Sequence, residues 1–203
     1  MKLRMAVALA LLGTSASFAL AQTTTAPSTT APSTAAPSGA TTAAPAAGKP
    51  AHAGKYGAIQ AVKIPLVEAV EVAEKITGKG EAVEVEFDSG GPNQSPYYEI
   101  KVLYPDGKFV EQTIDANTGA VLKTENKVFD RYFSRLKPSD LQAAKTSLRD
   151  AVGAAEKAIG NAARAVEAEI EKGGSDIIYE IELASPVGKH EVKVDSTGKV
   201  VKQ

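Results

Sequence analysis

The chain of 203 residues contains no cysteine and only two histidines. Without cysteine it can form neither a disulfide framework nor a thiolate metal site, and it has no thiol nucleophile. Its charge is nearly balanced, with 23 Lys and Arg against 24 Asp and Glu. A nucleic-acid-binding surface needs clustered basic residues, whereas here they are scattered among glutamates. Stability must therefore come from packing alone, and no nucleic-acid partner is indicated.

Long apolar runs are also missing, and the first 21 residues have the pattern of a secretory signal peptide. Lys2 and Arg4 give a positive start, residues 5–12 are apolar, and 19–21 form a small-residue cleavage site. The apolar stretch has about eight residues, whereas a membrane-spanning helix needs about 20. No cysteine follows the cleavage site to carry a lipid. The sequence predicts a signal peptide at 1–21 and a periplasmic or secreted mature chain without stable membrane insertion.

Residues 22–54 consist almost wholly of Ala, Pro, Ser, Thr and Gly, with Thr-Ala-Pro-Ser-Thr at 25–29 and again at 30–34. Such a segment lacks the bulky apolar groups that would offset the entropy lost on ordering. It is predicted to be a disordered, semi-extended linker. Two interpretations stay open: a tether through the cell envelope, with or without sugars on Ser and Thr, or a plain spacer. His52 has no second histidine nearby, which argues against a metal role.

The rest of the chain contains an internal repeat with an offset of 82 residues. Residues 59–78 align with 141–160 without a gap, and ten of the twenty positions are identical. In both segments apolar residues recur at helical spacing, with charged residues between them. Both segments end on a glycine, Gly78 and Gly160, a residue that commonly terminates helices. We therefore expect one amphipathic helix in each copy.

After each helix the apolar period changes to two, which is typical of strands with one packed and one solvated face. Strands are expected at 83–87, 98–102, 109–114 and 121–122 in the first copy, and at 166–170, 179–183, 191–194 and 200–201 in the second. The predicted fold class is α+β, with two tandem modules at 55–123 and 138–203. Each module is a helix packed on an antiparallel sheet of three to four strands. Whether the two sheets merge or stand apart is left open.

Residues 124–137 join the two modules. Val128, Phe129, Tyr132, Phe133 and Leu136 are spaced for an amphipathic helix, so a connecting helix is predicted at 124–137. Its aromatic side chains are expected to pack on at least one module. A ligand-binding aromatic patch is the alternative.

Candidates for catalysis are few. His190 lies on a predicted strand and is expected at the surface rather than as a base or metal ligand. Asp115 and Asp195 occupy matching places in the two copies, and aspartate is favoured in turns because it hydrogen-bonds the backbone two residues on. No phosphate loop, dinucleotide fingerprint or His-Glu-x-x-His motif occurs. The sequence predicts a protein that is not an enzyme, without catalytic residues, cofactor or metal.

Several short motifs recur in an order that resembles PepSY domains. They are Tyr98-Glu99-Ile100 and Asp-x-x-Thr-Gly-x-Val at 115–121 in the first copy, and Tyr179-Glu180-Ile181 with a shortened closing turn at 195–200 in the second. The resemblance suggests an exported protein with two tandem PepSY domains.

This resemblance implies a non-catalytic binding module that inhibits or regulates a peptidase or another protein of the cell envelope. The partner would be a protein or peptide, and the resemblance assigns no partner-binding residues. The alternative is a structural, envelope-associated protein, in which the linker acts as a flexible tether. The sequence indicates no oligomeric state.

Overall fold

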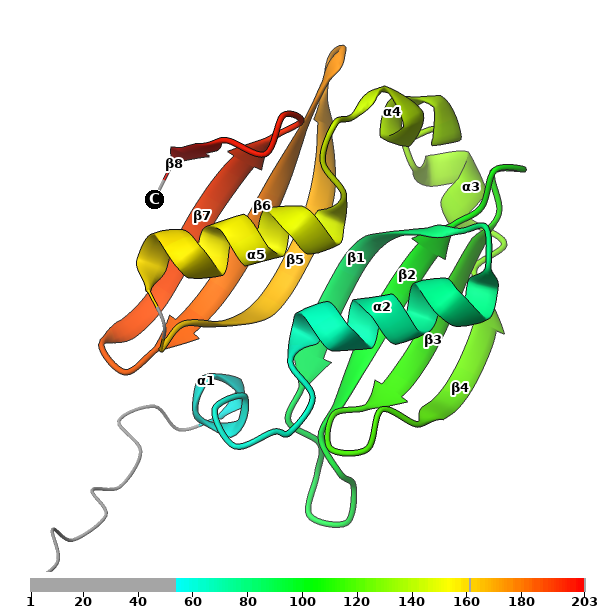
Figure 1. The fold of residues 1–203 in the computed structure, drawn as a ribbon. Helices are drawn as coiled ribbons and strands as arrows, with labels where there is room; N and C mark the ends of the chain where they lie inside the picture. The colour runs from blue at the N-terminus through cyan, green and yellow to red at the C-terminus, as the bar shows by residue number, and fades with distance from the viewer. Residues whose placement is uncertain (1–53, 161, 203) are drawn as a thin grey trace, which may run out of the picture. The chain divides into compact units, whose positions relative to one another are not determined.

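The computed structural model describes residues 54–160 and 162–202. They form an α+β fold in which two long helices cover one face of an antiparallel sheet (Figure 1). The predicted signal peptide and residues 22–53 of the predicted linker, including His52, lie outside the described residues. Within the described ranges, no helix combines the length and the apolar character that a membrane span needs.

The elements follow the same order in each half of the fold. The first half contains α1 (Lys55–Ala58), α2 (Leu66–Thr77), β1 (Glu81–Asp88), β2 (Tyr97–Leu103), β3 (Phe109–Asp115) and β4 (Val121–Asn126). After α3 (Asp130–Phe133), the second half contains α4 (Pro138–Ala143), α5 (Leu148–Ile159), β5 (Arg164–Gly173), β6 (Asp176–Ser185), β7 (Gly188–Asp195) and β8 (Val200–Lys202). Both long helices and all eight strands occur where the sequence periodicity predicted them.

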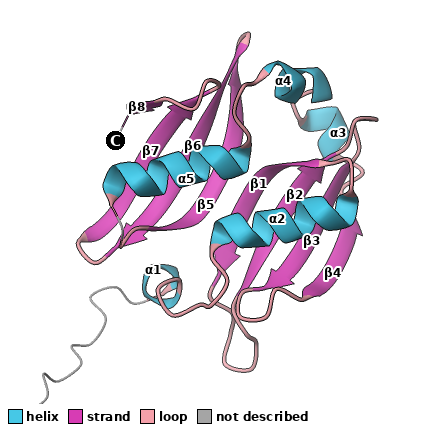
Figure 2. Cartoon of the chain, viewed as in Figure 1, coloured by secondary structure: helices cyan, strands magenta, loops and turns pink. Residues whose placement is uncertain are grey.

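The strands form one continuous sheet in the order β4-β3-β2-β1-β5-β6-β7-β8 (Figure 2). The two halves join where β1 pairs antiparallel with β5 and Val85 lies opposite Ala168. We call this β1–β5 pairing the seam. Both halves belong to one compact unit. The sheets therefore merge, which answers the question that the sequence left open.

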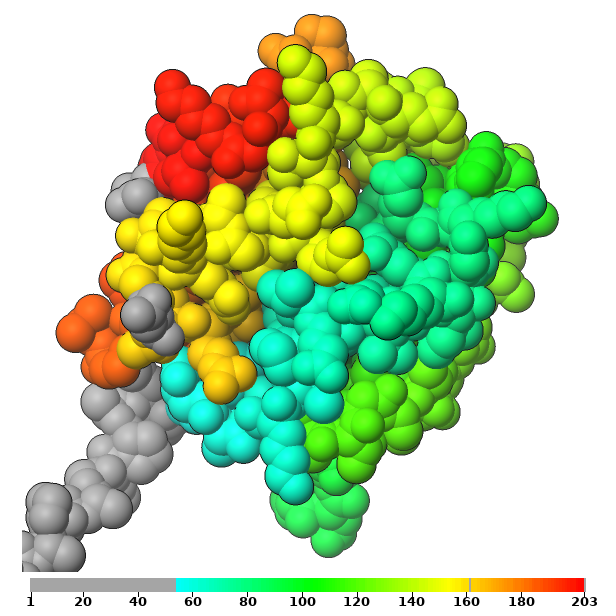
Figure 3. Space-filling view, viewed as in Figure 1, coloured from blue at the N-terminus to red at the C-terminus, as the bar shows by residue number. Residues whose placement is uncertain are grey.

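Helices α2 and α5 lie on the same face of the sheet (Figure 1) and contact each other across the seam (Figure 3). Their apolar stripes face the strands and form one core with them. The fully or nearly fully buried helix residues lie at matching positions, and they are Leu66, Ala69, Val70, Ala73, Leu148, Ala151, Val152 and Ala155. The small alanines allow the helices to approach the sheet closely. The sequence repeat thus corresponds to a repeated packing interface.

One buried tyrosine in each half holds the segment before the long helix against the sheet. The Tyr98 hydroxyl donates to the carbonyl oxygen of Ile64, at 2.7 Å, and the Tyr179 hydroxyl donates to that of Thr146. Ile64 and Thr146 each lie two residues before the first residue of their helix. Burial raises the pKa of Tyr179 to about 12, and burial also raises that of Tyr98. These are the tyrosines of the two Tyr-Glu-Ile motifs, so the motif has a structural role.

One glutamate near the C-terminal end of each long helix hydrogen-bonds to the strand that follows. Glu74 Oε1 accepts a hydrogen bond from the backbone N–H of Ala82, at 3.2 Å, and Glu156 Oε1 accepts one from Ala165, at 2.9 Å. Burial raises the pKa of both carboxyls. Glu74 and Glu156 occupy equivalent positions in the aligned segments 59–78 and 141–160. The repeat therefore preserves individual hydrogen bonds as well as packing.

The predicted connecting helix at 124–137 is wrong. Residues up to Asn126 continue as β4, and the helix here covers only Asp130–Phe133. Ser134, with φ −68° and ψ 133°, is extended and ends it. The strand persists because β4 keeps its pairing with β3 up to Asn126 opposite Val110. Pairing with β3 therefore determines the structure of residues 124–126, although the apolar residues of the connector are spaced as in a helix.

The expected packing of the connector aromatics is also wrong. Phe129, Tyr132 and Phe133 are 74%, 72% and 82% exposed, and Val128 is 60% exposed. Leu136 alone of the predicted apolar stripe is buried, at 7% exposure. A four-residue helix has barely one turn and cannot turn a continuous apolar face toward the core.

One buried polar group predicts a stabilising substitution. Gln112 is 1% exposed, and among the described residues its Oε1 has no hydrogen-bond partner. An unsatisfied buried polar atom costs about 1–3 kcal/mol. We expect Gln112→Met, which keeps the side-chain length, to raise the free energy of unfolding by about 1–2 kcal/mol in urea denaturation. Gln112→Glu is the matched control and should lower it, and a destabilised methionine variant would contradict the prediction.

Candidate functional site

The face of the sheet opposite α2 and α5 carries mostly charged side chains. Strand residues alternate between the two faces, so the residues between core positions point to this side. We call it the open face, and its charged residues on β1–β3 and β5–β7 are Glu84, Glu86, Glu99, Lys101, Glu111, Glu167, Glu169, Glu171, Glu180, Glu182, Lys189, Glu191 and Lys193. Glutamates outnumber lysines on it, which makes the centre of the sheet acidic.

The strand register arranges these residues in two rows across the seam. In one row, the residues on β6, β5, β1 and β2 are Glu180, Glu169, Glu84 and Lys101. In the other row, the residues on the same strands are Glu182, Glu167, Glu86 and Glu99. Like charges directly opposite each other on neighbouring strands destabilise a sheet. The second row in particular needs positive charge from outside the row.

Helix α1 supplies that charge at one end of the open face. Lys55 Nζ lies 3.1 Å from a carboxylate oxygen of Glu167, 3.6 Å from Glu86 and 3.8 Å from Glu182. The Tyr56 hydroxyl also donates to Glu182. Burial alone would lower the pKa of Lys55, but the hydrogen bond to Glu167 and the charges of Glu167, Glu182 and Glu86 together outweigh it and raise the pKa. Lys55 therefore links β1, β5 and β6 across the seam.

The connector crosses the other end of the open face. Lys101 Nζ lies 2.6 Å from Glu84 Oε2 and 3.2 Å from Oδ2 of Asp130 in α3. A cleft of about 270 Å³ lies between the connector and the sheet, lined among others by Phe133, Leu136, Lys101 and Glu169. A second cleft, of about 590 Å³, shares Phe133 and Leu136 and extends over β5, β6 and β7. Phe133 therefore lines both clefts.

The exposed apolar residues of the connector form the second part of the candidate site. Val128, Phe129, Tyr132 and Phe133 lie within six consecutive residues, and each is at least 60% exposed. We call them the connector patch. Exposed apolar patches rimmed by polar groups commonly mark protein–protein interaction sites. Phe133 borders charged residues of the open face through the two clefts, so the patch and the clefts together form the candidate binding surface.

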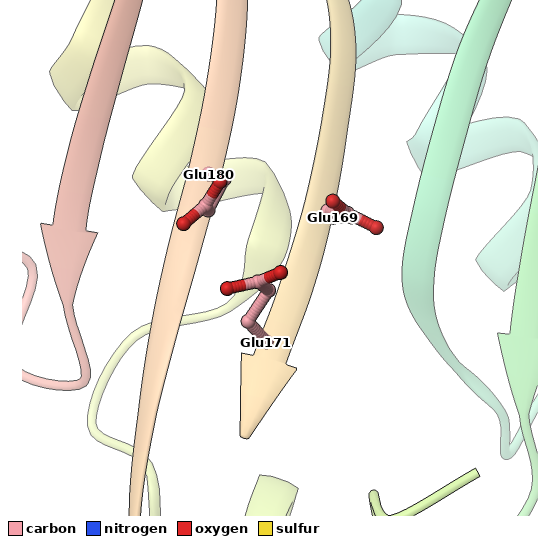
Figure 4. A group of neighbouring side chains, drawn as sticks. All are labelled: Glu169, Glu171 and Glu180. Carbon is pink, nitrogen blue, oxygen red and sulfur yellow. The ribbon is translucent and has the colours of Figure 1, made fainter. Parts of the chain in front are cut away.

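Three open-face carboxylates lie close enough to be considered as a metal site (Figure 4). Oxygens of Glu169, Glu171 and Glu180 lie within 4.8 Å of one another. Glu180 is already ion-paired with Lys193. A calcium ion takes six to eight oxygen ligands, and three glutamates with one engaged by lysine fall short of that. We assign no metal to them.

The crowding of carboxylates predicts a change in stability on Glu169→Gln. Burial, followed by the charges of Glu171 and Glu84, raises the pKa of Glu169. A carboxyl whose pKa is higher in the folded than in the unfolded state loses stability as it ionises, so its cost appears as the pH rises above its ordinary value of 4.5. We expect the variant to be more stable than wild type at pH 7, by less than about 1 kcal/mol because the site is partly exposed, and no more stable at pH 4.

Glu125→Gln is the matched control for this measurement. The hydrogen bond from Lys123 lowers the pKa of Glu125, so its removal should destabilise at pH 7, the opposite sign. Chemical denaturation of both variants at the two pH values checks the pair. Equal effects of the two substitutions would contradict the account of the acidic rows.

The structure places the two candidate aspartates far apart in the sheet order. Asp115 ends β3 and Asp195 ends β7, with four strands between those two strands. Asp115 Oδ1 accepts from the backbone N–H groups of Asn117, at 2.9 Å, and Thr118, at 2.8 Å. Asp195 Oδ1 accepts from the N–H of Thr197 at 2.9 Å. These contacts are those of turn residues, and the two carboxylates do not form a pair.

His190 has a partner that the sequence analysis missed. Its Nε2 lies 2.8 Å from Oγ of Ser185, across the β6–β7 hairpin. Ser185 Oγ also accepts from the N–H of Val187 at 3.2 Å. In the described part of the chain no carboxylate hydrogen-bonds His190. The pair is therefore a contact within a hairpin turn, and the five-residue spacing around the turn was the only signal for it.

Comparison with known protein families gives a match within the first half of the fold. Residues 63–125 match the PepSY family, described as the peptidase propeptide and YPEB domain. The matched segment runs from just before α2 into β4 and includes the Tyr98 and Asp115 motifs. No curated protein matches the chain.

One solved structure similar to this chain is that of a protein of Clostridium difficile 630, described as a candidate lipoprotein. The two sequences are 22% identical, the alignment covers 70% of this chain and 92% of the other, and the TM-score is 0.39.

Proposed function

We propose that this protein is an exported, non-catalytic binding protein that inhibits or regulates a protein of the cell envelope, with a peptidase as the first candidate. The PepSY match at 63–125 supports a binding role, because PepSY domains are generally peptidase propeptides or regulatory modules. We also propose that residues 138–203 form a second module of this family in tandem with 55–123. The repeated tyrosine and glutamate contacts support this assignment.

The observation that carries the binding role is the connector patch. Three aromatic side chains of the connector are at least 72% exposed, and Phe133 lines two clefts. Aromatic residues dominate the energetics of protein interfaces because they bury a large area with little loss of side-chain entropy. We infer that the partner covers Phe129, Tyr132 and Phe133 and contacts the adjacent charged open face.

Residues 1–54 have their own part in the proposal. A signal peptide at 1–21 would export the chain, and a flexible linker at 22–54 would act as a tether or as a plain spacer before the folded part. The folded part begins directly after this linker, because Lys55 and Tyr56 of α1 attach to the sheet through their contacts with Glu167 and Glu182.

The test compares two sets of exposed apolar residues on the mature chain, residues 22–203. Phe129→Ser combined with Phe133→Ser removes most of the connector patch, and Val187→Ser removes an equally exposed residue, at 86%, from the β6–β7 turn. The immobilised proteins are exposed to envelope extract, and peptidase activity is measured with and without each protein. We expect a stoichiometric protein partner and a change in peptidase rate that the double variant loses and Val187→Ser keeps.

Two outcomes would contradict the proposal. Equal recovery of the partner by the double variant would show that the connector patch does not carry binding. Recovery of cell-wall material alone, with no protein and no effect on peptidases, would support the structural, envelope-associated alternative.

A further inference from the structure

Strand β4 forms one edge of the eight-stranded sheet. It has six residues, and all but Glu125 are exposed. The strand at the opposite edge, β8, has only three residues. An edge strand of this length presents a row of backbone groups that can pair with another strand.

The register with β3 shows which backbone groups of β4 point outward. The N–H of Lys127 donates to the carbonyl oxygen of Phe109 at 2.9 Å, so residue 127 turns its backbone groups toward β3. Along an antiparallel strand this direction alternates. Lys123 and Glu125 therefore also turn inward, whereas Thr124 and Asn126 turn their N–H and C=O groups away from the sheet.

The side chains next to these outward groups carry opposite charges on one face. Lys123 lies opposite Thr113 and Glu125 opposite Glu111, so both project to the open-face side of the sheet. Within the chain Lys123 Nζ lies 2.8 Å from a carboxylate oxygen of Glu125. The sequence Lys-Thr-Glu is complementary to itself when two copies run antiparallel. Centred on Thr124, each Lys123 faces the Glu125 of the other copy.

We propose that β4 is a homodimer interface, in which two copies of this chain pair antiparallel about Thr124 and join their sheets edge to edge. This inference stands apart from the proposed function and uses a different surface. The two Lys–Glu contacts and the outward backbone groups of Thr124 and Asn126 would hold the pair.

The charges also select this register against its neighbours. Outward-facing backbone groups must lie opposite each other, so the register can slip only by two residues at a time. A slip in one direction puts Lys123 opposite Lys123, and a slip in the other puts Glu125 opposite Glu125. Like charges directly opposite destabilise the pairing. An unrelated extended peptide would leave Lys123 or Glu125 without such a match unless it carried the same pattern.

The absence of cysteine makes the register directly testable. In the full mature chain, Thr124→Cys introduces the only thiol, and the two copies would place these residues directly opposite each other. Opposed residues of a hydrogen-bonded antiparallel pair have Cα atoms about 5.5 Å apart, which lies within the range that a disulfide spans. Ser175→Cys, in the exposed β5–β6 turn, is the control for random collision. We expect Thr124→Cys to form disulfide-linked dimers at least about tenfold faster under mild oxidation.

A charge-reversal experiment tests the same proposal without a covalent bond. Lys123→Glu and Glu125→Lys each create like charges across the pair, so each variant alone should dimerise at least about tenfold more weakly in sedimentation analysis. Mixed in equal amounts, the two variants should form heterodimers, because each Glu again faces a Lys.

Three results would overturn the proposal. They are a wild-type chain that stays monomeric at several hundred micromolar, equal oxidation rates for the two cysteine variants, and a dimer that neither charge reversal weakens. A dimer that forms through another surface would appear as the last of these.

Discussion

Replacing Tyr98 by alanine is expected to lower the free energy of unfolding by about 3–5 kcal/mol, the usual cost of removing a buried aromatic ring. The ring is fully buried and lies 5.4 Å from that of Phe87, measured between centroids. Its hydroxyl holds the carbonyl of Ile64 at the entry to α2. The substitution leaves a cavity and an unpaired carbonyl at once, so both costs add.

The controls separate these two contributions. Tyr98→Phe removes only the hydroxyl and should cost about 1–2 kcal/mol. Tyr132→Ala removes an equally large ring that is 72% exposed, and it should change stability by less than about 0.5 kcal/mol. Thermal and urea unfolding of the three variants provide the comparison. A Tyr98→Ala variant as stable as Tyr132→Ala would contradict the account of the core.

Ala168→Pro is expected to abolish the folded state of both halves. Ala168 is completely buried and lies between Val85 on β1 and Ile181 on β6, at the centre of the sheet. Proline cannot donate a ladder hydrogen bond, and it is found in sheets essentially only at edges and bulges. Because α2 and α5 also contact each other across the seam, disrupting β5 would remove the strand through which the second half pairs with β1 of the first half.

Hydrogen exchange measured residue by residue checks this prediction. Val201→Pro is the matched control, because it places proline in the short edge strand β8, where the side chain is 52% exposed. We expect protection of β1–β3 to disappear in Ala168→Pro and to persist in Val201→Pro. If β1–β3 stayed protected in Ala168→Pro, the halves would be independent lobes rather than one cooperative sheet.

The sequence repeat and the period-two alternation were sufficient to predict both long helices and all eight strands, but not the short helices α1, α3 and α4. Local side-chain spacing decides which face of a helix or strand is buried, so α2, α5 and the strands could be read from it directly. The pairing of β1 with β5 could not be predicted in this way, because the alternation of apolar and polar residues describes a single strand and does not identify the strand beside it. The opposed glutamates, such as Glu84 facing Glu169, would even have argued against that pairing. Lys55, far away in sequence, offsets the repulsion in the adjacent row.

In the connector, the sequence pattern predicted a helix that the structure does not contain at that length. The spacing of Phe129, Tyr132 and Leu136 matched a helix, but the preceding residues were already engaged in pairing with β3. Long-range pairing of this kind leaves no mark in a local apolar pattern. Of the two interpretations of the aromatics, packing in the core was wrong. The exposed patch is the one that the structure leaves as the candidate binding surface.

The most direct test of the binding role is photo-crosslinking in the cells that make the protein. A photoreactive amino acid is placed at Tyr132, in the connector patch, and in a second strain at Val187, in the β6–β7 turn. The account predicts a covalent adduct with one defined envelope protein from position 132, identifiable by mass spectrometry, and none from position 187. No adduct at position 132, or the same adducts from both positions, would contradict it.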